Sequence, residues 1–382
     1  MRVYLDHNAT SPVRDEVADA ISRALRERWG NPSSVHAEGA AARAAVERAR
    51  ESVAALVGVS PREVVFTSGA SEANNTLLFG VAGGPGTAGR HVVTTAVEHP
   101  SVDAPLEALE AQGLGVTRVP VDGEGRVDPD AFAAALRETT VLASAIHGHN
   151  ETGVLQPLEA LAACAHARGV AFHADVTQAA GRIPLELTQA HVDFASLSAH
   201  KLGGPKGVGC LVARGERAFE PLLRGGPQER GRRGGTENVP GIVGFGVACE
   251  LALRELPRRA AVWGELRDRL WEGIEAKVPG ARRNGGSAHV LPNTLDVCFP
   301  GAAGDLLVQA LDLEGIAVSS GAACASGSVE PSRALRAYGL CAADARASLR
   351  FSLGHGVDAA QIDHVLALLP DLVSRVRAAE RA

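Results

Sequence analysis

Hydrophobic residues follow two alternating patterns along the first two thirds of the chain. Short apolar runs, typical of buried strands, alternate with stretches in which apolar residues recur at helical spacing. The expected strands cover residues 64–67, 91–95, 116–120, 141–146, 171–174, 194–196 and 209–212. This alternation predicts an α/β architecture in which helices cover a largely parallel sheet.

Three helices are predicted from the spacing of apolar residues and from the residues that follow them. The first covers residues 37–57 and is followed by Gly58, the second covers 155–168, and a long third covers 239–277. Residues 224–239, rich in glycine and charge, predict a loop before the long helix. That helix is expected to connect a large domain (15–260) to a smaller domain (1–14 and 261–382).

Charge and cysteine spacing exclude several classes of protein. The chain has 38 basic and 44 acidic residues, a net charge of -6, and no dense Lys/Arg block, so we expect no direct nucleic-acid partner. No apolar run reaches the length of about 18 residues that a membrane span needs. The N-terminus has no targeting pattern, which predicts a cytoplasmic protein. Six cysteines without C-x-x-C spacing predict neither a disulfide framework nor a zinc site.

Two ionisable residues follow predicted strands and could serve one cofactor. Lys201 ends the run Ser-Ala-His-Lys and precedes a glycine-rich turn, where an amine could form a Schiff base. Asp175 follows the strand at 171–174, where a carboxylate can pair with a protonated pyridine nitrogen. Each has an ordinary alternative, since most lysines are surface charges and Asp often caps a helix.

Two further motifs suit the same ligand. Residues 67–74 follow a strand and open a helix, so that free amides, Gly69 and the Ser71 hydroxyl would form a phosphate cradle. His99 follows the strand at 91–95, where an imidazole could stack on a flat ring and move protons, although a lone His is more often structural. All these groups fall at strand ends, where open α/β sheets bind ligands, and pyridoxal phosphate needs each of them.

With these motifs in order, the chain resembles the cysteine desulfurases, pyridoxal-phosphate enzymes of the class V aminotransferase superfamily. The resemblance runs from Tyr4 nearly to the C-terminus. It is carried by residues 4–10, 30–34, 66–70, 98–99, 150–153, 175–178, 198–201, 230–238, 319–324 and 350–354. The resemblance implies pyridoxal-phosphate fold type I, with a mostly parallel seven-stranded sheet in the large domain and a smaller α+β domain.

The resemblance also implies a role for each matching residue. Lys201 would be the Schiff-base lysine, Asp175 the pyridinium partner and His99 the stacking residue and acid. Gln178 would contact the ring hydroxyl, and Asn150 and Arg350 would bind the substrate carboxylate, with Asn150 also near the ring. The phosphate would be held by Ala70, Ser71, Ser198 and His200, and by Thr236 from the neighbouring subunit, which implies a homodimer with shared active sites.

Cys324 determines which reaction the resemblance implies. It stands in Ser-Ser-Gly-Ala-Ala-Cys-Ala-Ser-Gly-Ser, whose small residues offer little apolar shell for a buried structural cysteine. The resemblance implies that Cys324 takes sulfur from L-cysteine as a persulfide and leaves L-alanine. An acceptor protein, such as an iron-sulfur cluster scaffold or a tRNA-thiolation enzyme, would then receive the sulfur. In some relatives this cysteine also ligates a cluster, so Cys324 is the candidate metal ligand.

The chain departs from many relatives at two positions, and three other functions stay open. His149 stands where many relatives have Asn. Ser71 stands where many have Thr, and the serine keeps the hydroxyl group. A class V aminotransferase would use Lys201 and Asp175 but would not need Cys324. A selenocysteine lyase would depend less on this cysteine, and a binding scaffold would need none of the catalytic residues, yet all of them are intact.

Overall fold

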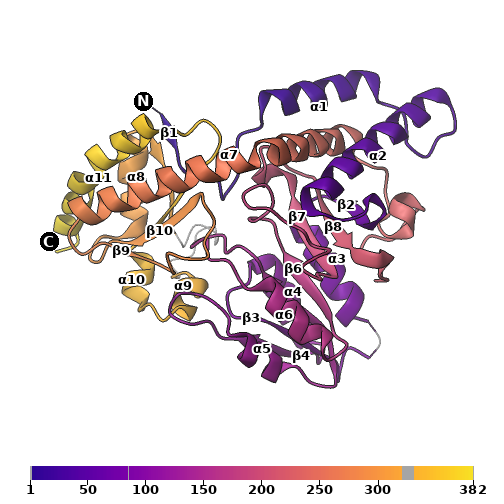
Figure 1. Cartoon of the computed structure of the whole chain (residues 1–382), viewed down its shortest axis with the longest axis horizontal. Helices are drawn as coiled ribbons and strands as arrows, with labels where there is room; N and C mark the ends of the chain where they lie inside the picture. Colours follow the sequence, from indigo (N-terminus) through magenta and orange to yellow (C-terminus); the bar gives the residue numbers. More distant parts are fainter. Residues whose placement is uncertain (1, 85, 321–330, 382) are drawn as a thin grey trace.

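The computed structural model describes residues 2–84, 86–320 and 331–381 and contains a seven-stranded sheet (Figure 1). Neighbouring strands in it are parallel except at β8, which runs antiparallel to both of its neighbours. The prediction of a mostly parallel seven-stranded sheet is therefore confirmed. In spatial order the strands are β2 (Val64–Thr67), β8 (Gly209–Ala213), β7 (Phe194–Ser198), β6 (Ala171–Asp175), β5 (Thr140–Ile146), β3 (His91–Thr95) and β4 (Gly115–Val119).

Helices connect and cover these strands, and two of them test the sequence predictions directly. Helix α2 (Ala37–Val57) has the predicted bounds and ends at Gly58, whose φ of 67° is readily adopted by glycine. Helix α6 (Leu158–His166) is shorter than predicted, because Leu155 is extended and pairs with Gly148 in an isolated antiparallel bridge. The other helices here are α1 (Asp15–Glu27), α3 (Ala70–Ala82), α4 (Pro100–Glu110) and α5 (Pro129–Ala135).

A second, antiparallel sheet lies in the C-terminal part of the chain. Its strand order is β12 (Ser319–Ser320), β13 (Ser348–Ser352), β10 (Thr294–Cys298) and β9 (Arg282–Arg283). Strand β1 (Val3–Tyr4) pairs in parallel with β11 (Ile316–Ala317), which ties the N-terminus to this part. The accompanying helices are α8 (Gly304–Leu313), α9 (Arg333–Ala337), α10 (Ala342–Arg346) and α11 (Ala359–Ala379).

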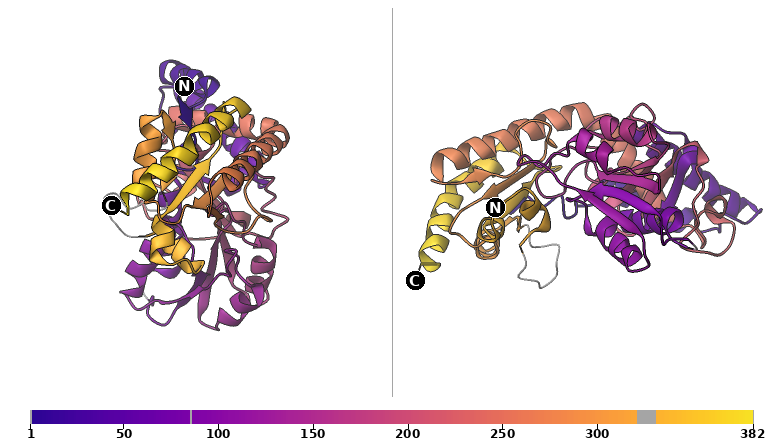
Figure 2. Two further views of the ribbon diagram at one scale, coloured as in Figure 1. Left: turned by 90° about the vertical axis from the view of Figure 1, so that its left-hand side faces the viewer. Right: turned by 90° about the horizontal axis from the view of Figure 1, so that it is seen from below.

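Helix α7 (Val239–Lys277) runs along most of the molecule and packs on α1 and α2 at one end and on α11 at the other (Figure 1). Both termini lie at the end that the C-terminal residues form (Figure 2). No helix in the described part of the chain is long and apolar enough to span a membrane.

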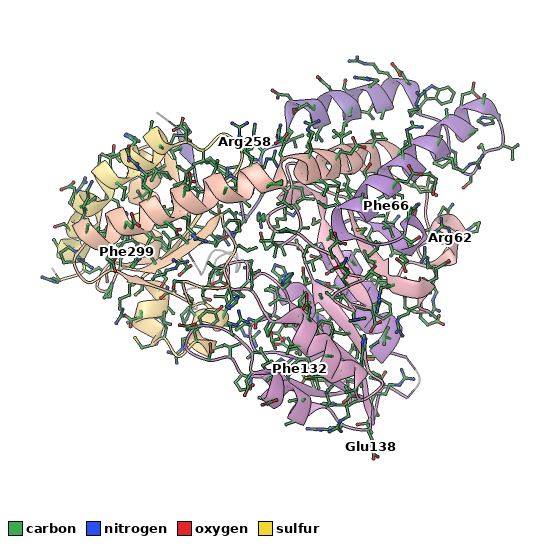
Figure 3. The ribbon with its side chains drawn as sticks, viewed as in Figure 1. Arg62, Phe66, Phe132, Glu138, Arg258 and Phe299 are labelled. Atoms are coloured by element: carbon green, nitrogen blue, oxygen red, sulfur yellow. The ribbon has the colours of Figure 1, made fainter. Side chains whose placement is uncertain are left out.

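Buried apolar side chains form separate clusters in the two parts. Phe66 and Phe132 belong to a large cluster around the seven-stranded sheet (Figure 3). Phe299 belongs to a second cluster, which also includes Val3 and Leu5 from the N-terminus. The N-terminal strand therefore packs with the C-terminal part, while the domain limits at residues 14/15 and 260/261 stay a prediction.

Candidate active site

A cavity of about 610 Å³ lies where the parallel strands end and the antiparallel sheet begins. Segments far apart in the sequence form its wall, among them the N-terminal segment, the start of α3 and strand β13. The predicted site residues that line it are Ala70, Ser71, His99, Asn150, Asp175, Gln178, Ser198, His200, Lys201 and Arg350. The carboxyl ends of parallel strands are where open α/β sheets bind ligands, so this cavity is the candidate active site.

Two predicted residues do not line the cavity of this chain. Thr236 is exposed, on the segment between η4 (Gln228–Gly231) and α7. Cys324 lies outside the described residues. Ser319, however, lines the cavity and pairs with Arg350 across β12 and β13, and Ser320 is the last described residue before position 321.

Asp175 ends strand β6 with both carboxylate oxygens hydrogen-bonded. Oδ2 accepts a bond of 3.0 Å from the Asn74 side chain, and Oδ1 accepts one of 3.0 Å from the Thr177 amide. The residue is only 4% exposed. These donors hold the carboxylate in one orientation at the cavity wall, as a partner for a protonated ring nitrogen requires.

His99 caps the N-terminus of α4 through its ring. Its Nδ1 lies 3.0 Å from the Ser101 amide, which donates to it, and 2.7 Å from the Ser101 hydroxyl. Burial lowers the pKa of His99, and Lys201 lowers it further, while Asp175 acts in the opposite direction. The ring therefore faces the cavity as a neutral imidazole at neutral pH.

The start of α3 forms a cradle with room for an anion. Ala70 and Ser71 open this helix of 13 residues, and its first amides have no partner within the helix. A Cβ at Gly209 would lie 2.7 Å from Gly69 Cα, so glycine is needed for this close approach of β8. Ser198 and His200 line the same cavity, and these residues fit a phosphate group.

Lys201 lies three residues beyond the end of β7, as the last residue of the short helix η2 (Ala199–Lys201). Its Nζ donates to the carbonyls of Asn8 at 2.6 Å and Ala9 at 2.8 Å. Gln178 Nε2 donates to the same Asn8 carbonyl at 3.0 Å. The N-terminal segment is therefore a wall of the site and holds the lysine amine at the edge of the cavity.

Arg350 is 4% exposed and reaches the cavity from β13. Its Nη2 donates to Asp6 Oδ1 at 2.7 Å, and its Nη1 donates to the Asn150 carbonyl at 3.0 Å. Nε is buried and has no hydrogen-bond partner among the described residues. The guanidinium is thus held in place beside the cavity, and a bound carboxylate would share it with Asp6.

His149 does not line the cavity, although it is one of the two departures from many relatives. It is 1% exposed, and its Nδ1 accepts from the Glu151 and Thr152 amides at 3.3 Å each. Burial lowers the pKa of His149 to about 3, so the ring is neutral. The histidine therefore lies outside the lining of the cavity.

Several lining residues had no role in the sequence analysis. Asp6 and Asn8 belong to the recognised stretch 4–10, and Ser319 to the stretch 319–324, so position within a motif was an available signal. Ser101 and Thr177 each stand two residues beyond a predicted site residue. Nothing in the sequence singled out Lys206.

Glu98 is a buried carboxyl directly before His99. Its Oε1 accepts bonds from the Thr95 hydroxyl at 2.6 Å and the Ile146 amide at 2.9 Å. Burial raises the pKa of Glu98 to about 7; the two bonds oppose this rise, and Asp175 adds to it. The folded protein therefore keeps this proton up to a higher pH than the unfolded chain, in which the pKa is near its ordinary value of 4.5.

Glu98→Gln is expected to stabilise the fold at high pH and to have little effect at low pH. Between about pH 4.5 and 7 the folded state binds more protons than the unfolded state, so wild-type stability falls as pH rises. Glutamine keeps the acceptor oxygen and cannot ionise. Urea unfolding of both cofactor-free proteins should show an advantage of about 1–3 kcal/mol for Glu98→Gln at about pH 8, absent at about pH 4. A difference independent of pH would contradict this.

Comparisons with known proteins give a consistent result. The family model described as aminotransferase class-V matches residues 3–365. A cysteine desulfurase of Cereibacter sphaeroides is 47% identical over 380 residues, which covers 99% of this chain and 97% of that protein. A protein named cysteine desulfurase IscS, of Dictyoglomus turgidum, is 41% identical and is covered to 95%.

Solved structures agree with the sequence comparisons. A structure titled NifS-like protein superposes with a TM-score of 0.92 at 38% identity, covering 98% of this chain and 100% of its own. A NifS-like protein from Rickettsia africae gives a TM-score of 0.87 at 28% identity, with the same coverage.

Proposed function

The chain belongs to the class-V aminotransferase family, and we propose that it is a pyridoxal-phosphate-dependent cysteine desulfurase. The observation that supports this best is a single cavity lined by the amine of Lys201, the carboxylate of Asp175, the imidazole of His99 and the guanidinium of Arg350. The relatives named cysteine desulfurase support the choice of reaction within the family. The alternatives of an aminotransferase or a selenocysteine lyase are not favoured by any of these relatives.

The residues present fit pyridoxal phosphate. Lys201 would bind its aldehyde carbon, Asp175 its ring nitrogen and Gln178 its ring hydroxyl, while His99 would stack on the ring. The start of α3, with Ala70 and Ser71, would hold the phosphate together with Ser198 and His200. When bound, the cofactor supplies an electron sink that stabilises negative charge on the substrate.

The residues of the chain would carry out the remaining steps. Arg350 and Asn150 would hold the carboxylate of L-cysteine, and the Lys201 amine would accept the α-proton as general base. The Cys324 thiolate would attack the substrate sulfur, so that a sulfur–sulfur bond forms as the carbon–sulfur bond breaks. His99 would return a proton, and L-alanine would leave with the sulfur remaining on Cys324 as a persulfide.

We also propose a homodimer in which Thr236 reaches the phosphate site of the partner subunit. Thr236 is exposed, on a loop held at two points of its own subunit. Arg233 pairs with Glu72 through bonds of 2.9 and 3.2 Å, and Glu229 pairs with Arg50. An exposed threonine on an anchored loop suits contact with a second copy.

Sulfur transfer from Cys324 to an acceptor protein completes the proposal. The acceptor would be an iron-sulfur cluster scaffold or a tRNA-thiolation enzyme. Cys324 would be the cluster ligand on such a scaffold, through its persulfide sulfur. Among the described residues no group of three His, Cys, Asp or Glu side chains is arranged to hold a metal ion. The cytoplasmic location expected from the N-terminus stays a prediction.

Cys324→Ser is expected to abolish release of both alanine and sulfide from L-cysteine, because the variant has no thiolate to take the sulfur. The purified wild type with a reductant should release the two products in equal amounts. The variant should keep the absorbance of its bound cofactor. Cys341→Ser is the matched control, since Cys341 is an exposed cysteine that caps α10 and serine can cap it equally well.

Two outcomes would overturn the assignment. Full activity of Cys324→Ser would favour a selenocysteine lyase, in which this thiol is not decisive. Consumption of cysteine only in the presence of an oxoacid would favour an aminotransferase.

A further inference from the structure

A chain of hydrogen bonds behind the cavity joins Asp175 to His99 through two side chains without a role so far. Asn74, on α3, is fully buried, and its Nδ2 lies 3.0 Å from Asp175 Oδ2 and 2.9 Å from Ser101 Oγ. Ser101 Oγ in turn lies 2.7 Å from His99 Nδ1. The two ends of the chain, Asp175 and His99, both line the cavity.

The carboxylate determines how the Asn74 amide is oriented. An ionised carboxylate only accepts hydrogen bonds, so the NH₂ group of Asn74 must face Asp175. The reversed amide would place its oxygen against the carboxylate. The second hydrogen of the same NH₂ group is then directed to Ser101 Oγ, which accepts it and keeps its own hydrogen for another acceptor.

That acceptor is the ring nitrogen of His99. The Ser101 amide also donates to Nδ1, at 3.0 Å, so two donors from one residue converge on this atom. A proton on Nδ1 would face both donors. The neutral ring therefore carries its proton on Nε2.

We propose that Asn74 and Ser101 are positioning residues that hold His99 as the tautomer protonated on Nε2 and couple this choice to Asp175. The ring nitrogen of His99 that carries the proton is thereby fixed before any substrate binds. This deepens the proposed function and rests on it for the use of that proton, whereas the tautomer itself can be measured without any reaction.

Several ionisable groups surround His99 and act on its protonation. Burial lowers its pKa, Lys201 beside the cavity lowers it further, Asp175 on β6 raises it, and His149 lies close enough for its own pKa to be affected by His99. Without Asn74, the Ser101 hydroxyl is free to turn and accept a proton from Nδ1. The Ser101 amide still opposes a proton on Nδ1, but it then does so alone, so loss of Asn74 should weaken the preference for the unprotonated Nδ1 and shift His99 toward the protonated ring.

The test is ¹⁵N NMR of the histidine rings in cofactor-free protein, with the His99 signals identified by their loss in His99→Gln. The wild type should show Nε2 protonated and Nδ1 bare. Asn74→Leu, which keeps the branching and the number of heavy atoms of the side chain, should show both tautomers and a His99 titration midpoint raised by about one pH unit, the size expected from one lost hydrogen bond. Thr76→Val is the matched control, because it removes a buried hydroxyl of α3 that has no hydrogen-bond partner among the described residues. It should change neither the tautomer nor the titration midpoint of His99.

A second pair of variants keeps the proposal testable if Asn74→Leu does not fold. Ser101→Ala should raise the midpoint in the same direction, and Ser101→Thr, which restores the hydroxyl, should return it to the wild-type value. A wild-type ring protonated on Nδ1, or unchanged spectra and midpoints in both Asn74→Leu and Ser101→Ala, would overturn the proposal. If the wild type with bound pyridoxal phosphate releases no sulfur from L-cysteine, the proposed function is contradicted, while the NMR result on the tautomer is unaffected.

Discussion

Lys201→Ala is expected to lower the rate of alanine formation from L-cysteine by about 10³-fold or more, because general-base transfer alone contributes about 10²–10⁴-fold. The variant loses the amine proposed both to bind the cofactor and to take the α-proton. The Asn8 and Ala9 carbonyls hold the Nζ of Lys201 at the cavity edge. Steady-state rates with added cofactor would measure the loss.

Borohydride reduction separates the two proposed roles of Lys201. It should attach pyridoxal phosphate covalently to the wild type and not to Lys201→Ala, as read by protein mass. Lys206→Ala is the matched control, because Lys206 lines the same cavity and carries the same charge but is exposed. That control should keep most of the turnover and should still be labelled. Covalent labelling of Lys201→Ala would contradict the assignment of Lys201 as the lysine that binds the cofactor.

Breaking the Arg50–Glu229 ion pair should lower the free energy of unfolding more than the changes at Glu98 or Arg269. Two bonds of 2.8 Å join the guanidinium to the carboxylate, and the Phe66 amide donates to Glu229 Oε2 at 2.9 Å. The side chains of Arg50 and Glu229 are only 5% and 2% exposed. Removing one partner leaves the other charge buried and unpaired, so Arg50→Met should cost about 3–5 kcal/mol.

Urea unfolding of the cofactor-free proteins can test this value. Adding Glu229→Leu to Arg50→Met should recover much of the loss, because the unpaired charge is then removed. Arg269→Met is the control: Arg269 and Asp363 form an exposed pair, each 52% exposed, which is expected to contribute about 0–1 kcal/mol. A midpoint for Arg50→Met that falls no further than that of Arg269→Met would show that the buried pair has little effect.

The same pair connects stability to the site. Glu229 has a φ of 49°, which is uncommon for a residue with a side chain, and the ion pair holds it there. Glu229 begins the segment that leads to Arg233 and Thr236. Arg50→Met should therefore also loosen the loop proposed to reach the partner subunit, and dimer dissociation should occur at a higher protein concentration than in the wild type.

Local sequence patterns were sufficient for most of the secondary structure. The run at 91–95, rich in β-branched residues, and the helical spacing at 37–57 each matched a described element in full. Valine and threonine suit a buried strand, and burial of one helix face imposes its period on the sequence. Helix α6 was predicted too long. Leu155, in its predicted first turn, is extended and pairs with Gly148, and such a pairing leaves no periodic signal.

The sequence by itself determined which chemical groups the site contains, because residue type and place after a strand are local properties: Lys201, Asp175 and His99 were identified in this way. Only the tertiary structure decided how those groups are held. The bond from Arg350 to Asp6 joins residues 344 positions apart, and the bond from Asn74 to Asp175 joins residues 101 apart. Hydrogen bonds and burial at such separations depend on which elements pack together, and the tautomer of His99 and the raised pKa of Glu98 follow from that packing.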